Sequence, residues 1–250
     1  MYLVSGIDRA ITQKLREKEL AETAARQPSG KLSASMLGEP LQWQVLKTLG
    51  VGVRVVDDYV LRKFARGKDT EDWFLTQIAV CVKNRQEFVS YRGAIGFIDA
   101  LIDTGVYGGS FGVLPLEIKS VTNAKFKRIE ERREPDDNHL LQGAFYGLAK
   151  NSSSFALTYI ASDDYRTLTW IFNTNDFKDR IDSIIELYDE AMAKHAIPLF
   201  KPNYKWQANL EYNKFPEWSN LNEKEINLAL AAYHPDAWEN YEAKKKGAGK

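Results

Sequence analysis

The sequence predicts an α/β or α+β domain in which a mixed central sheet is flanked by helices and preceded by a helical N-terminal cap. Two observations support this fold class. Apolar residues recur with a helical period up to about residue 82, and with the period of strands from residue 87. Beyond residue 137 a helix, two strands and a long amphipathic helix follow one another, as in a sheet covered by helices.

The first 65 residues are predicted to be mostly helical. Residues 8–26 form a polar helix, and the Pro, Ser and Gly residues of 27–35 interrupt the chain. Short helical pieces are expected over 35–49, with Gly50 as a C-cap, and another helix over about 54–65. This segment is long enough to form a cap or an arch over a site in the rest of the chain.

A separate helix is expected after Gly67, because glycine favours a break and Asp69 is a suitable N-cap. The apolar stripe of this helix consists of Phe74, Leu75, Ile78 and Val82.

Alternating apolar residues predict a sheet after this helix. The expected strands are 87–93, 94–103, 113–120, 154–162 and 167–174. A Gly-rich turn joins the second strand to the third, so these two are expected to run antiparallel. Helices are expected over 138–150 and 175–195, and the charged segment 123–137 is interpreted as a connection.

The C-terminal segment from Pro198 is rich in aromatic residues. It is expected to be extended at first and helical over about 222–244. The tail "KKKGAGK" (244–250) is expected to be disordered.

Composition limits the classes of partner. The chain has 250 residues, with 34 basic and 34 acidic side chains, so net charge gives no argument for binding nucleic acid or membrane. Such a partner needs a local patch. No signal peptide and no apolar run of 18 residues is visible, and Cys81 is the one cysteine, so a soluble protein of a reducing compartment, the cytoplasm, is expected.

Asp99 is the first candidate site residue. The strand "AIGFIDALID" is apolar on both faces, which is typical of a strand covered on both sides. A buried carboxylate there needs a cation or hydrogen-bond donors. The alternative is an aspartate at a strand end that accepts backbone hydrogen bonds.

The strand "VLPLEIKS" carries the second and third candidates. Leu114, Leu116 and Ile118 share one face, whereas Glu117 and Lys119 lie on the other. Antiparallel pairing with the preceding strand would bring Glu117 close to Asp99. The alternative is a charge pair that faces solvent.

Two helices supply further candidates. Glu71 falls on the apolar stripe of its helix, although an acid in a first turn also interacts favourably with the helix dipole. Gln142 and Tyr146 are four residues apart, so they are neighbours on a helix surface, and His139 lies on the same stripe. The alternative for these three is the polar edge of an amphipathic helix.

The order of these motifs resembles the PD-(D/E)XK nuclease superfamily, and more closely its RecB-type and phage-type exonuclease branch. The matching stretches are "RGKDTE" with Gly67 and Glu71, "GFIDA" with Asp99, "LEIKS" with Glu117 and Lys119, and "LLQGAFY" with Gln142 and Tyr146. The resemblance covers residues 66 to about 175. It implies a restriction-endonuclease-like catalytic core over 66–197 and a C-terminal extension over 198–250. With one cysteine, the four-cysteine iron–sulfur cluster of some relatives cannot form.

The residue types fit metal-assisted phosphodiester hydrolysis. Asp99 and Glu117 are hard oxygen ligands suited to Mg²⁺ or Mn²⁺. The carbonyl of Ile118 could add a ligand, and Glu71 could complete the shell of one ion. Lys119 could position or deprotonate the attacking water, or balance charge on the phosphate. By resemblance, Gln142 and Tyr146 orient the site and touch the nucleic-acid backbone.

Two basic stretches flank the proposed site. "KFKRIEERR" supplies Lys125, Lys127 and Arg128, and "RKFARGK" supplies Arg66. These four residues and His139 are the candidates for DNA contacts, although solvated charge is the alternative for each. "KPNYKWQANLEYNKF" interleaves basic and aromatic residues, as in single-strand-binding surfaces, but a segment wrapped over the core is the preferred interpretation.

The function that we expect is a metal-dependent DNA nuclease, an exonuclease on linear DNA with single-stranded ends. The resemblance implies recombination, repair or DNA degradation in a phage or bacterial setting, with a recombination or single-strand-binding protein as a candidate partner. The alternatives are a structure-specific or restriction-type endonuclease on the same core, and a non-catalytic nucleic-acid-binding module. Retention of Asp99, Glu117 and Lys119 together argues against the binding module.

Overall fold

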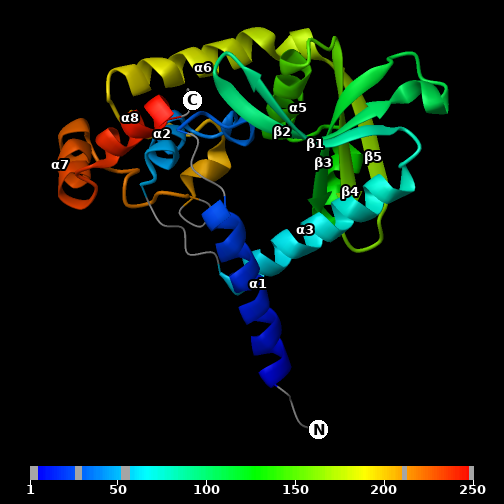
Figure 1. Cartoon of the computed structure of the whole chain (residues 1–250), viewed down its shortest axis with the longest axis horizontal. Helices are drawn as coiled ribbons and strands as arrows, with labels where there is room; N and C mark the ends of the chain where they lie inside the picture. The colour runs from blue at the N-terminus through cyan, green and yellow to red at the C-terminus, as the bar shows by residue number, and fades with distance from the viewer. Residues whose placement is uncertain (1–4, 26–29, 52–56, 210–212, 248–250) are drawn as a thin grey trace.

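The computed structural model describes residues 5–25, 30–51, 57–209 and 213–247. Its centre is a five-stranded sheet in the order β1-β2-β3-β4-β5 (Figure 1). The strands are β1 (Val82–Tyr91), β2 (Ala94–Asp103), β3 (Val113–Val121), β4 (Ser154–Ala161) and β5 (Thr167–Asn173). Only β3 and β4 pair in parallel, so the predicted mixed sheet is confirmed.

Helices cover both faces of the sheet, as the sequence predicted. Helix α3 (Asp58–Gln77) covers one face, where Phe74 and Leu75 pack against Leu116 and Ile118 of β3. Helix α5 (Asp137–Ala149) lies on the other face with the larger core, and α6 (Lys178–Ala193) packs against it. The site residues of β3 are therefore held between two packed layers.

Several of the remaining helices gather on one side of the sheet, and the N-terminal helix projects away from it (Figure 1). Helix α1 (Ser5–Ala25) packs along α3, whereas α2 (Leu41–Leu49) contacts α6 and α8 (Ala237–Gly247). The other helices are α4 (Asn123–Arg132), α7 (Glu223–Tyr233), η1 (Ala34–Met36), η2 (Thr104–Tyr107), η3 (Thr174–Phe177) and η4 (Lys205–Ala208). Gly50 is the C-cap of α2 with φ of 75°, as predicted.

The prediction of a new helix after Gly67 is wrong. Helix α3 is continuous through Gly67, and its N-cap is Asp57, whose side chain accepts a hydrogen bond from Val60 N at 2.8 Å. Asp69 lies in the helix interior. A glycine in a helix costs about 1 kcal/mol relative to alanine, and burial of Phe74 and Leu75 on the same helix offsets this cost.

The interpretation of residues 123–137 as a connection is also wrong in its first part. Helix α4 begins after Thr122, which caps Lys125 N, and it buries Phe126 and Ile129. Most of the other residues of this helix are charged, so its short amphipathic pattern was not recognised in the sequence. The predicted disordered tail needs a correction as well, because Lys244–Gly247 belong to α8, while residues 248–250 lie outside the described residues.

Strand β2 is less covered than predicted. Ile98 and Ala100 are buried, but Phe97 is 54% exposed and stacks edge to face on Phe88 of β1. The part of β2 near the hairpin therefore lacks a covering helix on one face. Among the described residues, no helix is both long and apolar enough to cross a membrane.

Candidate active site

The candidate site lies where β2 and β3 separate. Their paired positions run from Asp103 and Val113 to Ala100 and Leu116. Asp99 and Glu117 are the next residues on each strand. Beyond this point the Ile118 N–H has no carbonyl of β2 to bond, and it donates instead to Asp99 Oδ2 at 2.8 Å. The carboxylate of Asp99 thus bridges the opening between the strands.

The backbone of Ile118 also faces this opening. In a strand the N–H and C=O of one residue point to the same side. Because Ile118 N donates to Asp99, its carbonyl oxygen is directed at the same opening. The side chain of Ile118 packs on the opposite core with Phe74 and Leu75, as the alternation of β3 predicted.

Glu117 is the most buried carboxylate of the site. It is 1% exposed, and Lys119 Nζ forms an ion pair with its Oε1. Its Oε2 is buried and has no hydrogen-bond partner among the described residues. Burial, with a contribution from the charge of Asp99, raises the pKa of Glu117 to about 8. Burial likewise raises the pKa of Asp99.

Lys119 connects the carboxylates to helix α5. Its ammonium donates to Gln142 Oε1 at 3.0 Å, and Gln142 Nε2 donates to the Tyr146 hydroxyl at 3.0 Å. Burial alone would lower the pKa of Lys119, but the adjacent Glu117 carboxylate raises it overall. The ammonium is therefore protonated at neutral pH. Because the Glu117 side chain is buried, the alternative of a Glu117–Lys119 pair that faces solvent is wrong.

Tyr146 packs directly against β2. It is 3% exposed, and burial, with the charge of Glu117, raises the pKa of its hydroxyl. A Cβ atom at Gly96 would lie 2.7 Å from the Tyr146 ring and 2.9 Å from Ala34 Cβ. Glycine at this position therefore allows β2 to approach the Gln142–Tyr146 pair closely.

Glu71 enters the site from the middle of α3. It is the fourteenth residue of this helix, so the helix dipole of a first turn does not explain it. Burial, followed by the charge of Asp99, raises the pKa of Glu71 to about 7. Its Oε1 accepts a hydrogen bond from Gln86 Nε2 at 3.1 Å.

Gln86 is the site residue that sequence reasoning missed. It lies on β1 at the position opposite Asp99, between the paired residues Arg85 and Glu87, and its φ is 50°. Its side chain interacts with both Glu71 and Asp99. A non-glycine residue in this conformation is strained, and such strain concentrates at functional sites. A polar residue in an exposed strand gives no sequence signal for this role.

A cleft of about 550 Å³ gives access to Glu71 and Lys119. Its walls come from α3, the end of β3 and helix α1, which contributes Glu19. Lys63 and Lys68 line it on α3. Of the basic stretch "RKFARGK", these two residues, rather than Arg66, face the cleft.

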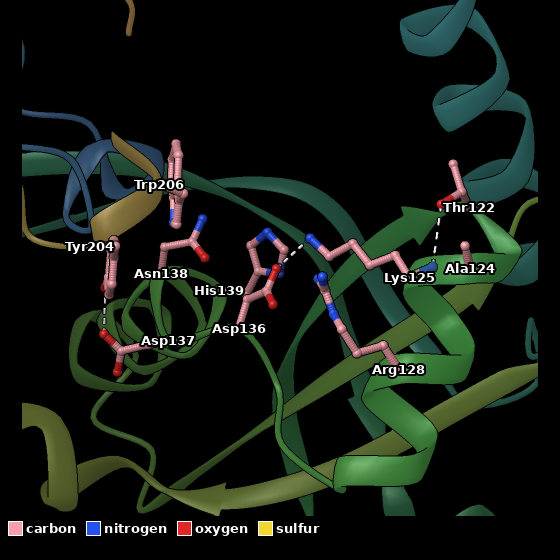
Figure 2. Close-up of a pocket in the computed structure, with 10 residues that line it drawn as sticks. All are labelled: Thr122, Ala124, Lys125, Arg128, Asp136, Asp137, Asn138, His139, Tyr204 and Trp206. Carbon is pink, nitrogen blue, oxygen red and sulfur yellow. Dashed lines mark hydrogen bonds and ion pairs between the residues drawn. The ribbon is translucent and has the colours of Figure 1, made fainter. Parts of the chain in front are cut away.

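The predicted DNA contacts are distributed over three places. Arg66 points to Asp163 at 3.5 Å, outside the cleft. Lys127 is exposed, with Glu131 at 3.8 Å. Lys125, Arg128 and His139 line a second cavity at the start of α4 and α5 (Figure 2).

The donor set fits a divalent cation with few protein ligands. No group of three His, Cys, Asp or Glu side chains at ligand spacing occurs within the described residues, so Glu71 does not converge with Asp99 and Glu117. Mg²⁺ binds through one or two carboxylates, with water and phosphate as further ligands. Asp99, the unpartnered Oε2 of Glu117 and the Ile118 carbonyl meet that requirement.

The raised pKa values predict that the metal-free protein loses stability with rising pH. The unfolded chain loses these protons near pH 4.3, whereas the folded chain keeps them up to about pH 7 at Glu71 and about pH 8 at Glu117. The free energy of unfolding therefore falls as pH rises through this window. The melting temperature in a chelator should be lower at pH 8.5 than at pH 7, a range above the titration of unfolded histidine.

Glu117→Gln is the control for this pH dependence. The variant lacks the carboxyl group whose pKa is raised to about 8, so its melting temperature should change less between pH 7 and 8.5. Burial lowers the pKa of His139, so this residue makes the free energy of unfolding rise with pH, but only below about pH 6.5, where the unfolded histidine titrates. If the melting temperature falls equally with pH in the variant and the wild type, Glu117 is not the group that causes the pH dependence.

Comparisons with known proteins identify the fold alone. No family model and no curated protein matches the chain. The solved structure of SSO0001 is 16% identical, covers 86% of this chain and 97% of its own, and has a TM-score of 0.52.

Two exonucleases are less similar in structure. The alkaline exonuclease LHK-Exo from Laribacter hongkongensis is 14% identical, with 69% of this chain and 97% of that chain covered and a TM-score of 0.44. A phage-related exonuclease from Haemophilus somnus is 11% identical, with 66% of this chain and 96% of that chain covered and a TM-score of 0.42. With TM-scores below 0.5, they do not bear on the residues of the site.

Proposed function

We propose that this protein is a metal-dependent nuclease that hydrolyses phosphodiester bonds of DNA. The observation that carries the proposal is the buried Glu117 carboxylate, whose Oε2 has no partner in the described part of the chain and whose neighbours are Asp99 and Lys119. Lys119 compensates Oε1 but leaves Oε2 unpaired, and a buried unpaired carboxylate oxygen is costly, so a cation is the natural occupant of this position.

Asp99, Glu117 and the Ile118 carbonyl would hold one Mg²⁺ or Mn²⁺ ion. Such an ion supplies charge stabilisation at the phosphate and acidifies a bound water. Gln86 interacts with both the Glu71 and the Asp99 side chains, so Glu71 would support this ion from outside its ligand set.

Lys119 donates hydrogen bonds to the attacking water or to the phosphate. Its raised pKa keeps it protonated, which favours positioning and charge balance over removal of a proton. Gln142 and Tyr146 orient it through two consecutive hydrogen bonds. Lys63 and Lys68, on the wall of the cleft, contribute phosphate contacts near the site.

We further propose that the substrate is linear DNA and that cleavage starts at an end. Helices α1 and α3 form walls of the cleft that gives access to Lys119. A cleft that is enclosed in this way admits a free DNA end more readily than an uninterrupted duplex. Linear DNA labelled at one end should be shortened progressively, while a relaxed, covalently closed circle should survive in the same reaction. Nicking of the circle at the rate of linear cleavage would favour the endonuclease alternative.

Glu71→Gln should raise the metal concentration required for half-maximal activity. The carboxylate interacts with Asp99 and is desolvated, so its loss weakens the charge that attracts a cation. The effect should be roughly tenfold, the lower end of the range for outer-shell partners of metal ligands. A Mn²⁺ titration of cleavage measures it, with Asp69→Asn, an exposed carboxylate two residues away, as the control.

A change in melting temperature without a change in the metal titration would assign Glu71 a purely structural role.

A further inference from the structure

A second cavity of about 790 Å³ lies beside the candidate active site (Figure 2). Its volume is within the range of ligand sites. Thr122, which follows β3 directly and caps α4, lines the cavity; it is three residues after Lys119, which corresponds to about 10 Å of extended chain. The cavity adjoins the active site without containing Glu71, Asp99 or Glu117.

One wall of this cavity presents hydrogen-bond donors. Lys125 forms an ion pair with Asp136, so part of its charge is already compensated. For Arg128 no hydrogen bond or ion pair occurs within the ranges that the structure describes. Figure 2 shows the Arg128 guanidinium, the Lys125 ammonium and the His139 ring converging beside the Asp136 carboxylate, which also lines the cavity. A planar guanidinium without an acidic partner suits a phosphate.

His139 adds a donor without a charge. Tyr159, which is fully buried, accepts a hydrogen bond from Asp136 N at 2.9 Å, and its hydroxyl lies 2.7 Å from His139 Nδ1. We assign the tautomer in which Nδ1 accepts the hydroxyl proton, so that the imidazole carries its own hydrogen on Nε2. Burial, aided by Lys119 and Lys125, lowers the pKa of His139 well below its usual value and keeps it neutral.

The opposite wall is aromatic and fixed in place. Trp206 is 45% exposed, and its ring is parallel to that of Tyr204, with 3° between the planes. The fully buried Gln207 anchors the segment, because its amide donates to Gly38 O at 3.1 Å and accepts from Tyr204 N at 3.0 Å. The segment does wrap over the core through Gln207, but Trp206 points outward into the cavity.

We infer that this cavity is a subsite for one nucleotide of single-stranded DNA next to the position of cleavage. Arg128, Lys125 and the Nε2–H of His139 bind a phosphate of that nucleotide, and its base stacks on Trp206. Within a duplex both faces of a base are covered by its neighbours, whereas an unpaired base offers a face for such stacking. The inference rests on the proposed function and deepens it, since it specifies single-stranded DNA as the substrate at this position.

Binding without cleavage tests the subsite separately from the nuclease activity. The probe is a fluorescein-labelled twelve-nucleotide oligothymidylate in a chelator, followed by fluorescence anisotropy. Trp206→Ala and Arg128→Gln should each weaken binding about tenfold, the scale of one lost stacking or phosphate contact. Trp206→Phe should retain most of the affinity, because it keeps an aromatic face. Tyr233→Ala and Lys194→Gln, two exposed side chains elsewhere, should bind as the wild type does.

A second probe separates the base from the phosphate. With an abasic oligonucleotide of the same length, Trp206→Ala should cause no further loss, whereas Arg128→Gln should still weaken binding. Unchanged affinity of both variants for oligothymidylate, or failure of the wild type to bind it, would overturn the subsite. Absence of cleavage by a wild type that binds in this pattern would instead overturn the proposed nuclease function.

Discussion

Replacing Glu117 with glutamine is expected to abolish DNA cleavage while DNA binding persists. The substitution keeps the size of the side chain but removes the carboxylate that is buried beside Asp99 and Lys119. Charge stabilisation by a metal is worth several kcal/mol, so we expect a loss of at least about 1,000-fold in rate. Asp99→Asn should behave in the same way, since Asp99 faces the same opening.

Rates of cleavage and affinity for an oligonucleotide, measured on the same preparations, test this prediction. Glu190→Gln, an exposed carboxylate on α6, is the matched control and should cleave at the wild-type rate. The melting temperature of Glu117→Gln in a chelator verifies that the fold is retained. Near wild-type turnover by either site variant would show that the site is misplaced.

Lys119→Ala is expected to lower turnover by roughly two to four orders of magnitude, the contribution of a positioned proton-donating group. The ammonium bonds to both Glu117 and Gln142, so its loss disconnects the carboxylates from α5. Binding of Mn²⁺ should survive, because an ammonium is not a metal ligand. KM for DNA should change less than kcat.

Calorimetric titration with Mn²⁺ distinguishes this role from a structural one. Gln142→Ala should cause a smaller loss of turnover in the same direction, since Gln142 acts by orienting Lys119. A Lys119→Ala protein that no longer binds Mn²⁺ would indicate that Lys119 maintains the site rather than acting on the substrate.

The alternation of β3 made much of the site predictable. Leu114, Leu116 and Ile118 face the α3 core, while Glu117 and Lys119 lie on the opposite face of the strand, as a period of two requires. The Gly-rich turn before β3 also predicted antiparallel pairing with β2, which brings Asp99 to Glu117. Both features depend on local sequence, and both are confirmed.

Other features depend on contacts that a local pattern does not contain. The continuity of α3 through Gly67 follows from burial of Phe74 and Leu75 against the sheet, which outweighs a weak local preference. Gln86 reaches Glu71 and Asp99 because its backbone has a positive φ. Trp206 faces a cavity because Gln207 bonds to Gly38, 169 residues earlier in the chain.

One measurement tests the central claim most directly: degradation of end-labelled linear DNA by the purified wild type and by Glu117→Gln. Each protein is incubated with Mg²⁺, with Mn²⁺ and with a chelator. If the metal-dependent site consists of Asp99, Glu117 and Lys119, the wild type should degrade the DNA with at least one of the ions. The wild type in the chelator and the variant under all conditions should leave the DNA intact. Equal degradation by the variant, or an inactive wild type with both ions, would contradict the assignment of this site.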